Sequence, residues 1–467
     1  MTTPSGTLRS SVERHIPQLL QALDRYPSLP IFTPADAGFE ERRPIQNIAI
    51  EEKPWAIVCP ESEEEVVAVV RACSQSKPPV SLSIRVGGHD GGGRALISNG
   101  VVIDLRQLNS IALADDRASA RVSGGILLGT LAKFLDDHDL MTPTGWSTTV
   151  GYVGWATGGG YGTMQGTHGF GVDQILGARL VKAGGEVVDT DQDPELLWAL
   201  RGAGTGVLGV VVEVRIKTYP IPNMLGGTLM FPLNDAENVL TQIGKMHQPD
   251  EFSGEFTSVR VPDLGPALIC LFNWTPRPGQ EAEDLQEGKE FLEQICGMGN
   301  VLLNTVTEKR PYEFMKEISH DVPQTKYTVR SKLMKGLTPE FAKIISRNPV
   351  INENSAIIIH NAHGPSTKPD SDAVFPNRRP HLAIGLCGSA LSNTDSSFET
   401  ASNWVDEYVQ RFENSGEVLG GGYMNFMHPI ESNTLEVFGE DGTERLRKLK
   451  KKYDGENIFS RGYPSLT

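Results

Sequence analysis

The sequence is poor in cysteine and contains no long hydrophobic run. Its five cysteines are odd in number and widely scattered, a pattern that shows neither a disulfide framework nor a metal motif and is typical of buried thiols in a reducing compartment: Cys59, Cys73, Cys270, Cys296 and Cys387. No run of about 18 apolar residues occurs, which excludes a membrane-spanning helix. The first residues, Met1 to Leu8, lack a basic region followed by an apolar core. We therefore expect no secretory signal and a cytoplasmic protein.

Basic residues are also scarce. The chain has 43 lysines and arginines against 58 aspartates and glutamates, which gives a net charge of −15. A nucleic-acid-binding protein needs a basic face, and the largest basic group here, Lys448 with Lys450, Lys451 and Lys452, is typical of a solvated helix face. With 39% hydrophobic and 22% charged residues the composition is that of a globular protein. A length of 467 residues predicts two or three domains.

Glycine, by contrast, is gathered in loops. Residues 80–85 alternate apolar and polar side chains, as a half-buried strand does, and the run Arg85-Val86-Gly87-Gly88-His89-Asp90-Gly91-Gly92-Gly93 follows directly. Glycines let backbone N–H groups turn toward an anion without interference from a Cβ. The run therefore suits a cofactor diphosphate, and it places the nucleophilic imidazole of His89 beside that anion.

Three further segments complete a pattern. Residues 143–162 form a second glycine-rich loop, residues 193–211 read as a helix, a glycine turn and a strand, and residues 452–459 lie near the end of the chain. Together with the first loop, and in this order, they resemble the flavin-linked oxidases of the vanillyl-alcohol oxidase superfamily, specifically the berberine bridge enzyme-like branch. The resemblance covers about residues 50–467.

The resemblance implies an FAD cofactor bonded covalently to His89, the histidine of the Arg-x-Gly-Gly-His element. In many members the position of Ser147 is a cysteine that makes a second bond to the flavin. A hydroxyl is far less nucleophilic than a thiolate, so we expect a single link. The other cofactor-binding residues that the resemblance implies are Arg85, Val86, Gly87, Gly88, Asp90, Gly91, Gly145, Ser147, Val150, Gly151, Gly154, Gly158, Gly160, Tyr161, Gly206, Gly209, Val210, Val211, Asn425 and Asn457.

One glycine motif points elsewhere when read alone. Residues 204–209 satisfy Gly-x-Gly-x-x-Gly, the fingerprint of a Rossmann dinucleotide site. That fingerprint follows a strand and opens a helix. Here a helical pattern precedes the glycines and a β-branched run, residues 210–216, follows them. The order of elements is reversed, which argues against a Rossmann site.

The pattern of elements and the resemblance predict an α+β protein. We expect a two-lobed PCMH-type FAD-binding domain in residues 1–220, with its core at about 50–220. A substrate domain, an antiparallel sheet backed by helices, should occupy residues 221–420, and residues 421–467 should return to the first domain. Ser62 and Glu65 predict a capping box. Local patterns predict strands at 80–85, 101–105 and 119–123 and helices at about 126–138, 280–296 and 337–346.

Flavin oxidation of a C–H bond needs a hydride acceptor, a base and a substrate held against the ring. Family members commonly take active-site groups from the positions of Tyr161 and Tyr423. His360 and His363, in the apolar strand 356–364, are alternatives because imidazole ordinarily titrates near neutrality. We expect the tyrosines to contribute more than the histidines, although a tyrosine base would need its ordinary pKa near 10 to be lowered.

A departure from the family lies in the strand at residues 381–387, which follows Phe375-Pro376-Asn377-Arg378. Ile384 and Leu386 are expected where plant alcohol-oxidising relatives carry Lys and Gln. An apolar strand facing the flavin indicates a small or medium hydrophobic organic substrate, and we expect a role in secondary metabolism. Val150 matches a family position where valine accompanies oxygen access, so we expect an oxidase that uses O₂. The alternative is a flavoprotein of this fold that catalyses a non-redox cyclisation or pericyclic step, with FAD structural.

Overall fold

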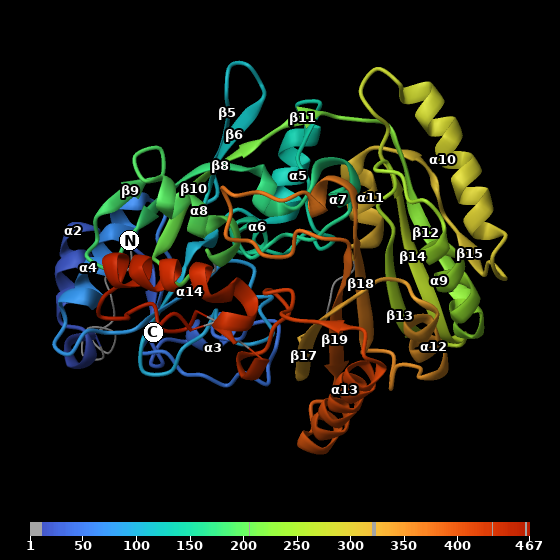
Figure 1. Ribbon diagram of the computed structural model, residues 1–467. Helices are drawn as coiled ribbons and strands as arrows, with labels where there is room; N and C mark the ends of the chain where they lie inside the picture. Colours follow the sequence, from blue (N-terminus) through green and yellow to red (C-terminus); the bar gives the residue numbers. More distant parts are fainter. Residues whose placement is uncertain (1–11, 205, 320–323, 432, 463–464) are drawn as a thin grey trace.

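The computed structural model describes residues 12–204, 206–319, 324–431, 433–462 and 465–467. The expectation about a secretory signal concerns residues 1–8, which lie outside the described residues. Within the described ranges, no helix is both long and apolar enough to cross a membrane. The chain forms two small lobes followed by a large sheet domain, and its C-terminal segment crosses back over the lobes (Figure 1).

The first lobe is built on a four-stranded sheet in the order β1-β2-β4-β3. Strands β2 and β3 run parallel to β4, and β1 pairs antiparallel with β2. Val66, Val69 and Val70 recur along one face of α4 and are buried with the sheet. The elements are α2 (Gln18–Arg25), β1 (Ile31–Phe32), α3 (Phe39–Arg42), β2 (Ala56–Val58), α4 (Glu63–Gln75), β3 (Leu82–Arg85), β4 (Val101–Asp104) and η1 (Leu105–Gln107).

The second lobe is an antiparallel sheet in the order β5-β6-β10-β8-β9, covered by short helices. β7 and β11 form a separate pair. The elements are β5 (Ile111–Leu113), β6 (Ser119–Ser123), α5 (Leu128–Asp136), β7 (Leu140–Met141), α6 (Tyr152–Thr157), α7 (Gln165–His168), η2 (Gly171–Gln174), β8 (Ile175–Val181), β9 (Val187–Asp189), α8 (Pro194–Ala203), β10 (Val210–Lys217) and β11 (Tyr219–Pro220).

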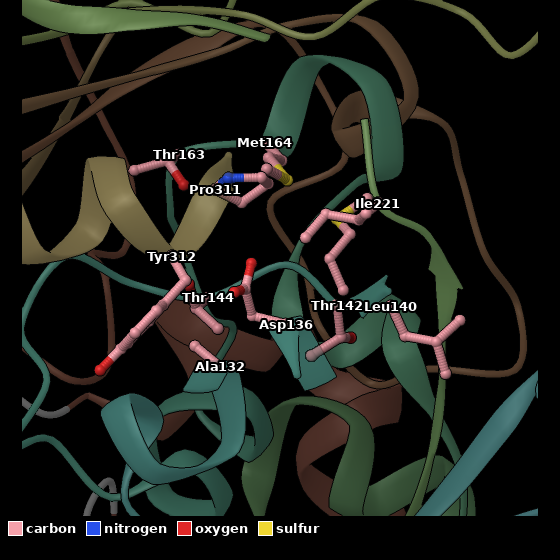
Figure 2. A pocket seen from close by; sticks show the side chains of 11 residues that line it. Ala132, Asp136, Leu140, Thr142, Thr144, Thr163, Met164, Ile221, Pro311 and Tyr312 are labelled. Carbon is pink, nitrogen blue, oxygen red and sulfur yellow. The ribbon is translucent and has the colours of Figure 1, made fainter. Parts of the chain in front are cut away.

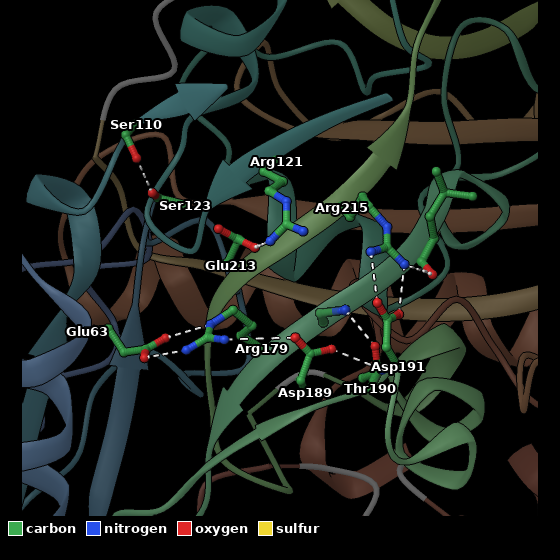
Figure 3. Close-up of polar contacts among 12 residues, drawn as sticks. Glu63, Ser110, Arg121, Ser123, Arg179, Asp189, Thr190, Asp191, Glu213 and Arg215 are labelled. Carbon is green, nitrogen blue, oxygen red and sulfur yellow. Dashed lines mark hydrogen bonds and ion pairs between the residues drawn. The ribbon is translucent and has the colours of Figure 1, made fainter. Parts of the chain in front are cut away.

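An arginine of β8 ties the two lobes together (Figure 3). The guanidinium of Arg179 binds both carboxylate oxygens of Glu63 at the start of α4, at 2.6 and 3.0 Å, and lies 3.8 Å from Asp189 of β9. Nearby on the same sheet, Arg215 of β10 binds Asp191 at 2.7 Å. Bidentate arginine–carboxylate pairs add directional specificity, so this pair fixes how α4 sits on the second sheet.

The large sheet domain is a nine-stranded antiparallel sheet in the order β15-β12-β14-β13-β18-β19-β17-β20, with β16 also paired to β12. Helices α9, α10, α12 and α13 cover its outer face (Figure 1) and enclose the largest apolar core. The strands are β12 (Met224–Pro232), β13 (Glu255–Val261), β14 (Gly265–Trp274), β15 (Leu303–Asn304), β16 (Thr307–Lys309), β17 (Tyr327–Met334), β18 (Ala356–Ala362), β19 (His381–Ser389) and β20 (Val418–Leu419). The helices are η3 (Leu233–Asp235), α9 (Ala236–Lys245), α10 (Glu281–Cys296), α11 (Pro311–Ile318), α12 (Pro339–Arg347), η4 (Gly364–Thr367), α13 (Asp395–Ser415) and η5 (Pro429–Glu431).

The last helix, α14 (Thr434–Tyr453), returns to the lobes (Figure 1). Its Lys450 was expected on a solvated face, and this is wrong: the side chain is buried. Its ammonium donates to the carbonyls of Val207 and Phe459 and binds Asp454 at 2.7 Å. Burial lowers the pKa of Lys450, and the carboxylate of Asp454 opposes that effect. Lys450 thus joins the turn at 204–209 to the C-terminal tail.

The predicted fold class, α+β with a PCMH-type cofactor domain, is confirmed, while local details differ. Ser62 caps α4 by accepting from the N–H of Glu65, but Glu65 accepts from the N–H of Glu61 in place of Ser62, so the capping box is incomplete. β3 begins at Leu82 in place of residue 80, because the N–H of Val80 bonds to the Cys73 carbonyl at the end of α4. All five cysteines are free thiols, three of them buried.

Candidate active site

The two glycine-rich loops lie backbone against backbone. A Cβ added to Gly87 would come within 2.2 Å of the Thr149 carbonyl oxygen, and one added to Gly151 would come within 2.7 Å of the Val86 side chain. Such distances exclude any side chain larger than hydrogen at these two positions. Gly87 and Gly151 are therefore required for the close approach of the two loops.

His89 lies where these loops meet. Its Nε2 is 2.9 Å from the hydroxyl of Thr149, which is in turn 3.1 Å from the hydroxyl of Ser147. Burial lowers the pKa of His89 to about 4. The imidazole is therefore neutral at physiological pH, and a neutral imidazole has the lone pair that a nucleophile needs.

An open surface adjoins the two loops. Gly154 is exposed on α6, between buried neighbours, and no atom lies within 4 Å of the position that its Cβ would take. Gly158 and Gly160 on the same loop are packed instead: a Cβ on Gly158 would reach Asn425 at 2.2 Å. Asn425 donates to the Trp155 carbonyl, at 3.0 Å, and so ties the C-terminal segment to this loop. The exposed backbone at Gly154 therefore leaves α6 uncovered by described side chains at this point.

The other predicted cofactor residues divide into backbone and side-chain positions. Arg85 does not present its guanidinium to the loops: the side chain is 3% exposed and is ion-paired with Asp104 of β4. Asp90 pairs with Arg94, whose guanidinium also donates to the Met424 carbonyl.

Gly206 and Gly209 adopt positive φ values beside β3 and β8, Val210 and Val211 are buried in β10, and Asn457 has a φ of 53° in the C-terminal tail. Gly88 also adopts a positive φ, whereas Gly91, Gly145 and Val150 lie in the two loops.

Two residues of the second glycine-rich loop meet residues from distant parts of the chain in an aromatic cluster, defined as Trp146, Tyr161, His360, Tyr423 and Phe426. The rings of Tyr161 and Tyr423 are 4.5 Å apart between centroids, and the ring of His360 lies 5.3 and 5.7 Å from them. The structure therefore brings together three of the four predicted catalytic residues. Burial raises the pKa of both tyrosines, which opposes a role as base at neutral pH.

The fourth candidate, His363, follows β18 and lies elsewhere. Its ring approaches Gly166 of α7, and burial lowers its pKa while the carboxylate of Asp250 opposes that effect. None of its described ring contacts is with the aromatic cluster. A small hollow lies between α5, β7 and α11 and is lined by Ala132, Leu140 and Tyr312, among others (Figure 2). Its lining includes Thr144 of the second glycine-rich loop but none of the predicted site residues.

The prediction that Ile384 and Leu386 of β19 face the site is wrong. Ile384 and Leu386 are buried against α12 and α13 on the outer face of the sheet. The face toward the aromatic cluster carries His381, Ala383 and Gly385 instead. Because successive side chains of a strand point to opposite faces, a shift of one residue in an alignment exchanges the whole set. Beyond His381, β19 therefore presents small side chains to the site.

Two polar residues of the site were not predicted. His381 Nε2 lies 2.6 Å from the hydroxyl of Tyr161, and its Nδ1 lies 2.6 Å from the Arg379 carbonyl. Glu255 of β13 is 1% exposed, and its Oε1 is 3.1 Å from Nδ1 of His360. Successive side chains of a strand point to opposite faces, so Glu255 lies on the face opposite to the core residue Phe256. This alternation in residues 255–259 is the sequence signal that could have placed Glu255 on the site face.

Comparison with known proteins identifies the chain. Residues 54–191 match the family described as FAD binding domain, and residues 422–461 match the family described as berberine and berberine like. The FAD-linked oxidoreductase aurO of Gibberella zeae is 30% identical over 450 residues, covering 94% of this chain and 86% of that protein. The (R)-6-hydroxynicotine oxidase of Paenarthrobacter nicotinovorans is 38% identical over 201 residues, 42% of this chain and 43% of that one.

Solved structures share the fold. The 6-hydroxy-D-nicotine oxidase of Arthrobacter nicotinovorans superposes with a TM-score of 0.81 at 24% identity, covering 93% of this chain and 97% of that chain. A variant of berberine bridge enzyme gives a TM-score of 0.80 at 20% identity, covering 94% and 97%. With two family models matched and a relative that is 30% identical over most of both lengths, the chain belongs to the berberine bridge enzyme-like family of FAD-linked oxidoreductases.

Proposed function

We propose that the protein is an oxidase that holds FAD through one covalent bond to His89 and oxidises a small or medium hydrophobic organic substrate, with O₂ as electron acceptor. The observation that carries the proposal is the contact of the two glycine-rich loops at His89, next to the aromatic cluster. Since Thr149 engages Nε2, the other ring nitrogen, Nδ1, is the atom that we expect to bond to the flavin.

The substrate class follows from the inner face of the large sheet. Ile269, Thr257, Ile358 and Gly385 are partners in register across four neighbouring strands, and the two isoleucines are half-buried. The adjoining aromatic cluster offers flat apolar surfaces, and its tyrosines can donate hydrogen bonds while neutral. This combination favours an aromatic compound that carries an alcohol or amine group, and a role in secondary metabolism.

The proposal is tested by turnover in air. Compounds of three kinds form a suitable panel: (R)-6-hydroxynicotine, the compound named for one relative, a benzylic alcohol and a phenolic tertiary amine. An oxidase should consume O₂ and release hydrogen peroxide in proportion to a product lighter by two hydrogen atoms. Consumption of a panel compound to a product of unchanged mass, without peroxide, would count against the proposal.

A cysteine at position 147 should bond to the flavin. The hydroxyl of Thr149 lies within hydrogen-bond distance of both the Ser147 hydroxyl and Nε2 of His89, so the side chains of Ser147 and His89 lie close together. In the double variant His89→Ala, Ser147→Cys we expect a cysteinyl-flavin peptide, because a thiolate supplies the nucleophile that serine lacks. Peptide mass spectrometry measures it, with His89→Ala, Ser147→Ala as the control. A folded, FAD-loaded sample without the cysteinyl peptide would contradict the assigned orientation of Ser147.

The non-redox alternative loses the observation that favoured it. It rested on Ile384 and Leu386 lining the site, and both side chains lie on the outer face of the sheet. The inner face of β19 is still without a charged side chain, but a polar pair lies nearby, with His360 on the adjacent strand β18 and Glu255 on β13 beyond it. The oxidase therefore remains the function that the arrangement supports best.

A further inference from the structure

Glu255 and His360 are neighbours across two strands at the centre of the large sheet. Their Cα positions are in register between β13 and β18, and His360 is in register with Ala383 of β19. The side chains of Glu255, His360 and Ala383 therefore form one row on the face that meets the aromatic cluster. At the point where β19 supplies only small residues, this row supplies an ionisable pair.

The pair is withdrawn from water. The side chains of His360 and Glu255 are 5% and 1% exposed. Their nearest atoms are 3.1 Å apart, within ion-pair distance, although the angle between them falls outside hydrogen-bond geometry. Among the described residues, the two carboxylate oxygens of Glu255 have no hydrogen-bond partner. The same is true of Nε2 of His360. A buried carboxylate with no fixed donor is costly to keep in a fold, which indicates a use.

Apart from Glu255, the described contacts of the His360 ring are with neutral aromatic side chains. Its ring lies 5.2 Å from Trp146 and 5.8 Å from Phe426, both apolar faces. The titratable or charged groups that face the pair from other elements are Tyr161, Tyr423 and His381, with Cys270 of β14 near Glu255 and Arg94 acting on Tyr423. Burial lowers the pKa of His381 to about 4 and raises the pKa of both tyrosines, so these three groups are neutral near pH 7.

We propose that Glu255 and His360 act together as the proton acceptor of the oxidation, with His360 as the catalytic residue and Glu255 as its positioning residue. This inference rests on the proposed function. It reverses the ranking expected from the sequence, because it gives Tyr161 and Tyr423 the task of holding the substrate while neutral. It also adds a residue, Glu255, that no motif of the chain indicated.

The chemistry balances without another reactant. Bound FAD supplies the acceptor for the hydride, that is, the hydrogen and electron pair of the substrate C–H bond. The O–H or N–H bond of the same substrate breaks, its electron pair forms the new C=O or C=N bond, and its proton passes to His360. The negative charge of Glu255 offsets the charge that His360 gains. At low pH the pair already holds a proton, because burial raises the pKa of Glu255 despite the opposing effect of His360, so the rate should rise with pH.

Histidine NMR and flavin reduction test the pair in the FAD-loaded protein. The NMR signal of the His360 imidazole is identified by its absence in His360→Gln. In Glu255→Gln, the pH midpoint of that signal should fall by about one to three pH units, because the carboxylate charge that favours the protonated imidazole is gone. The rate of anaerobic flavin reduction with the benzylic alcohol of the panel above, whose O–H bond supplies the proton, should show the same downward shift of its rising limb. His360→Gln should lower the plateau rate about 10² to 10⁴-fold, more than Tyr161→Phe or Tyr423→Phe does.

Two further variants separate a proton role from a structural one. Glu255→Asp keeps the charge and should give an intermediate midpoint, which also covers a failure of Glu255→Gln to fold. Glu251→Gln makes the same change at a glutamate that pairs with Arg277, at 2.8 Å, and should leave both profiles unchanged. An identical His360 midpoint in wild type and Glu255→Gln, or an unshifted rate profile, would overturn the pair. Failure of every panel compound to bleach wild-type flavin would count against the proposed function, while the NMR result would still decide the coupling.

Discussion

The Asp104→Ala variant should lose about 3–5 kcal/mol of unfolding free energy, because it leaves a buried arginine without its counter-charge. Arg85 and Asp104 are each 3% exposed, and the guanidinium of Arg85 contacts the carboxylate directly. Burial alone would raise the pKa of Asp104, but the hydrogen bonds from Arg106 and the charge of Arg85 outweigh it and lower the pKa. Arg85 immediately precedes the first glycine-rich loop, so this pair also anchors the loop that carries His89.

Urea unfolding of the FAD-loaded protein measures the loss. The matched control is Arg106→Ala, which removes a partner of the same carboxylate that is 48% exposed and should cost about 1 kcal/mol or less. Because the folded-state pKa of Asp104 is lowered, its contribution is present above the ordinary value of 3.8 and is lost as the pH falls through the folded value. A loss below about 1 kcal/mol for Asp104→Ala would show that the buried pair does not anchor the first lobe.

The His89→Ala variant should lose its acid-stable flavin completely. Wild-type protein precipitated with acid should retain stoichiometric yellow flavin, whereas the variant, which keeps both glycine-rich loops, should bind FAD and release all of it in acid. The lowered pKa of His89, about 4, keeps the ring neutral and able to attack at neutral pH. Absorbance of the washed pellet is the measurement.

Ser147→Ala is the control for that experiment, because a serine at this position should not carry the flavin. Its pellet should stay as yellow as that of wild type. Wild-type flavin that comes off entirely in acid would refute the covalent link and leave the fold assignment untouched. Flavin retained by His89→Ala would place the attachment at another residue.

Local sequence patterns predicted much of this molecule because the physical reasons are local. The glycine-rich runs at residues 85–93 and 143–162 predicted loops, and the structure adds that Gly87 and Gly151 are needed where the two backbones approach. The apolar periodicity predicted α10 and α12 closely, since burial of one helix face repeats every turn. The reversed order of elements around residues 204–209 correctly argued against a Rossmann fingerprint, as α8 precedes the turn and β10 follows it.

Local sequence patterns did not predict contacts between residues that are far apart in the chain. Which face of β19 meets the site depends on its register with β17 and β18, and in an almost wholly buried strand both faces are apolar or small, so alternation gives no sign. The partnership of Glu255 with His360 exists only across strands. Lys450 resembled its exposed neighbours because only the fold reveals the two carbonyls that its ammonium meets.

Anaerobic mixing of the FAD-loaded protein with its substrate tests the central claim most directly. Hydride transfer from the substrate must reduce the flavin, so the oxidised absorbance bands should bleach in step with product formation and return when O₂ is admitted. A product that forms at the same rate while the flavin spectrum stays fully oxidised would contradict the oxidase assignment and leave FAD with a structural role.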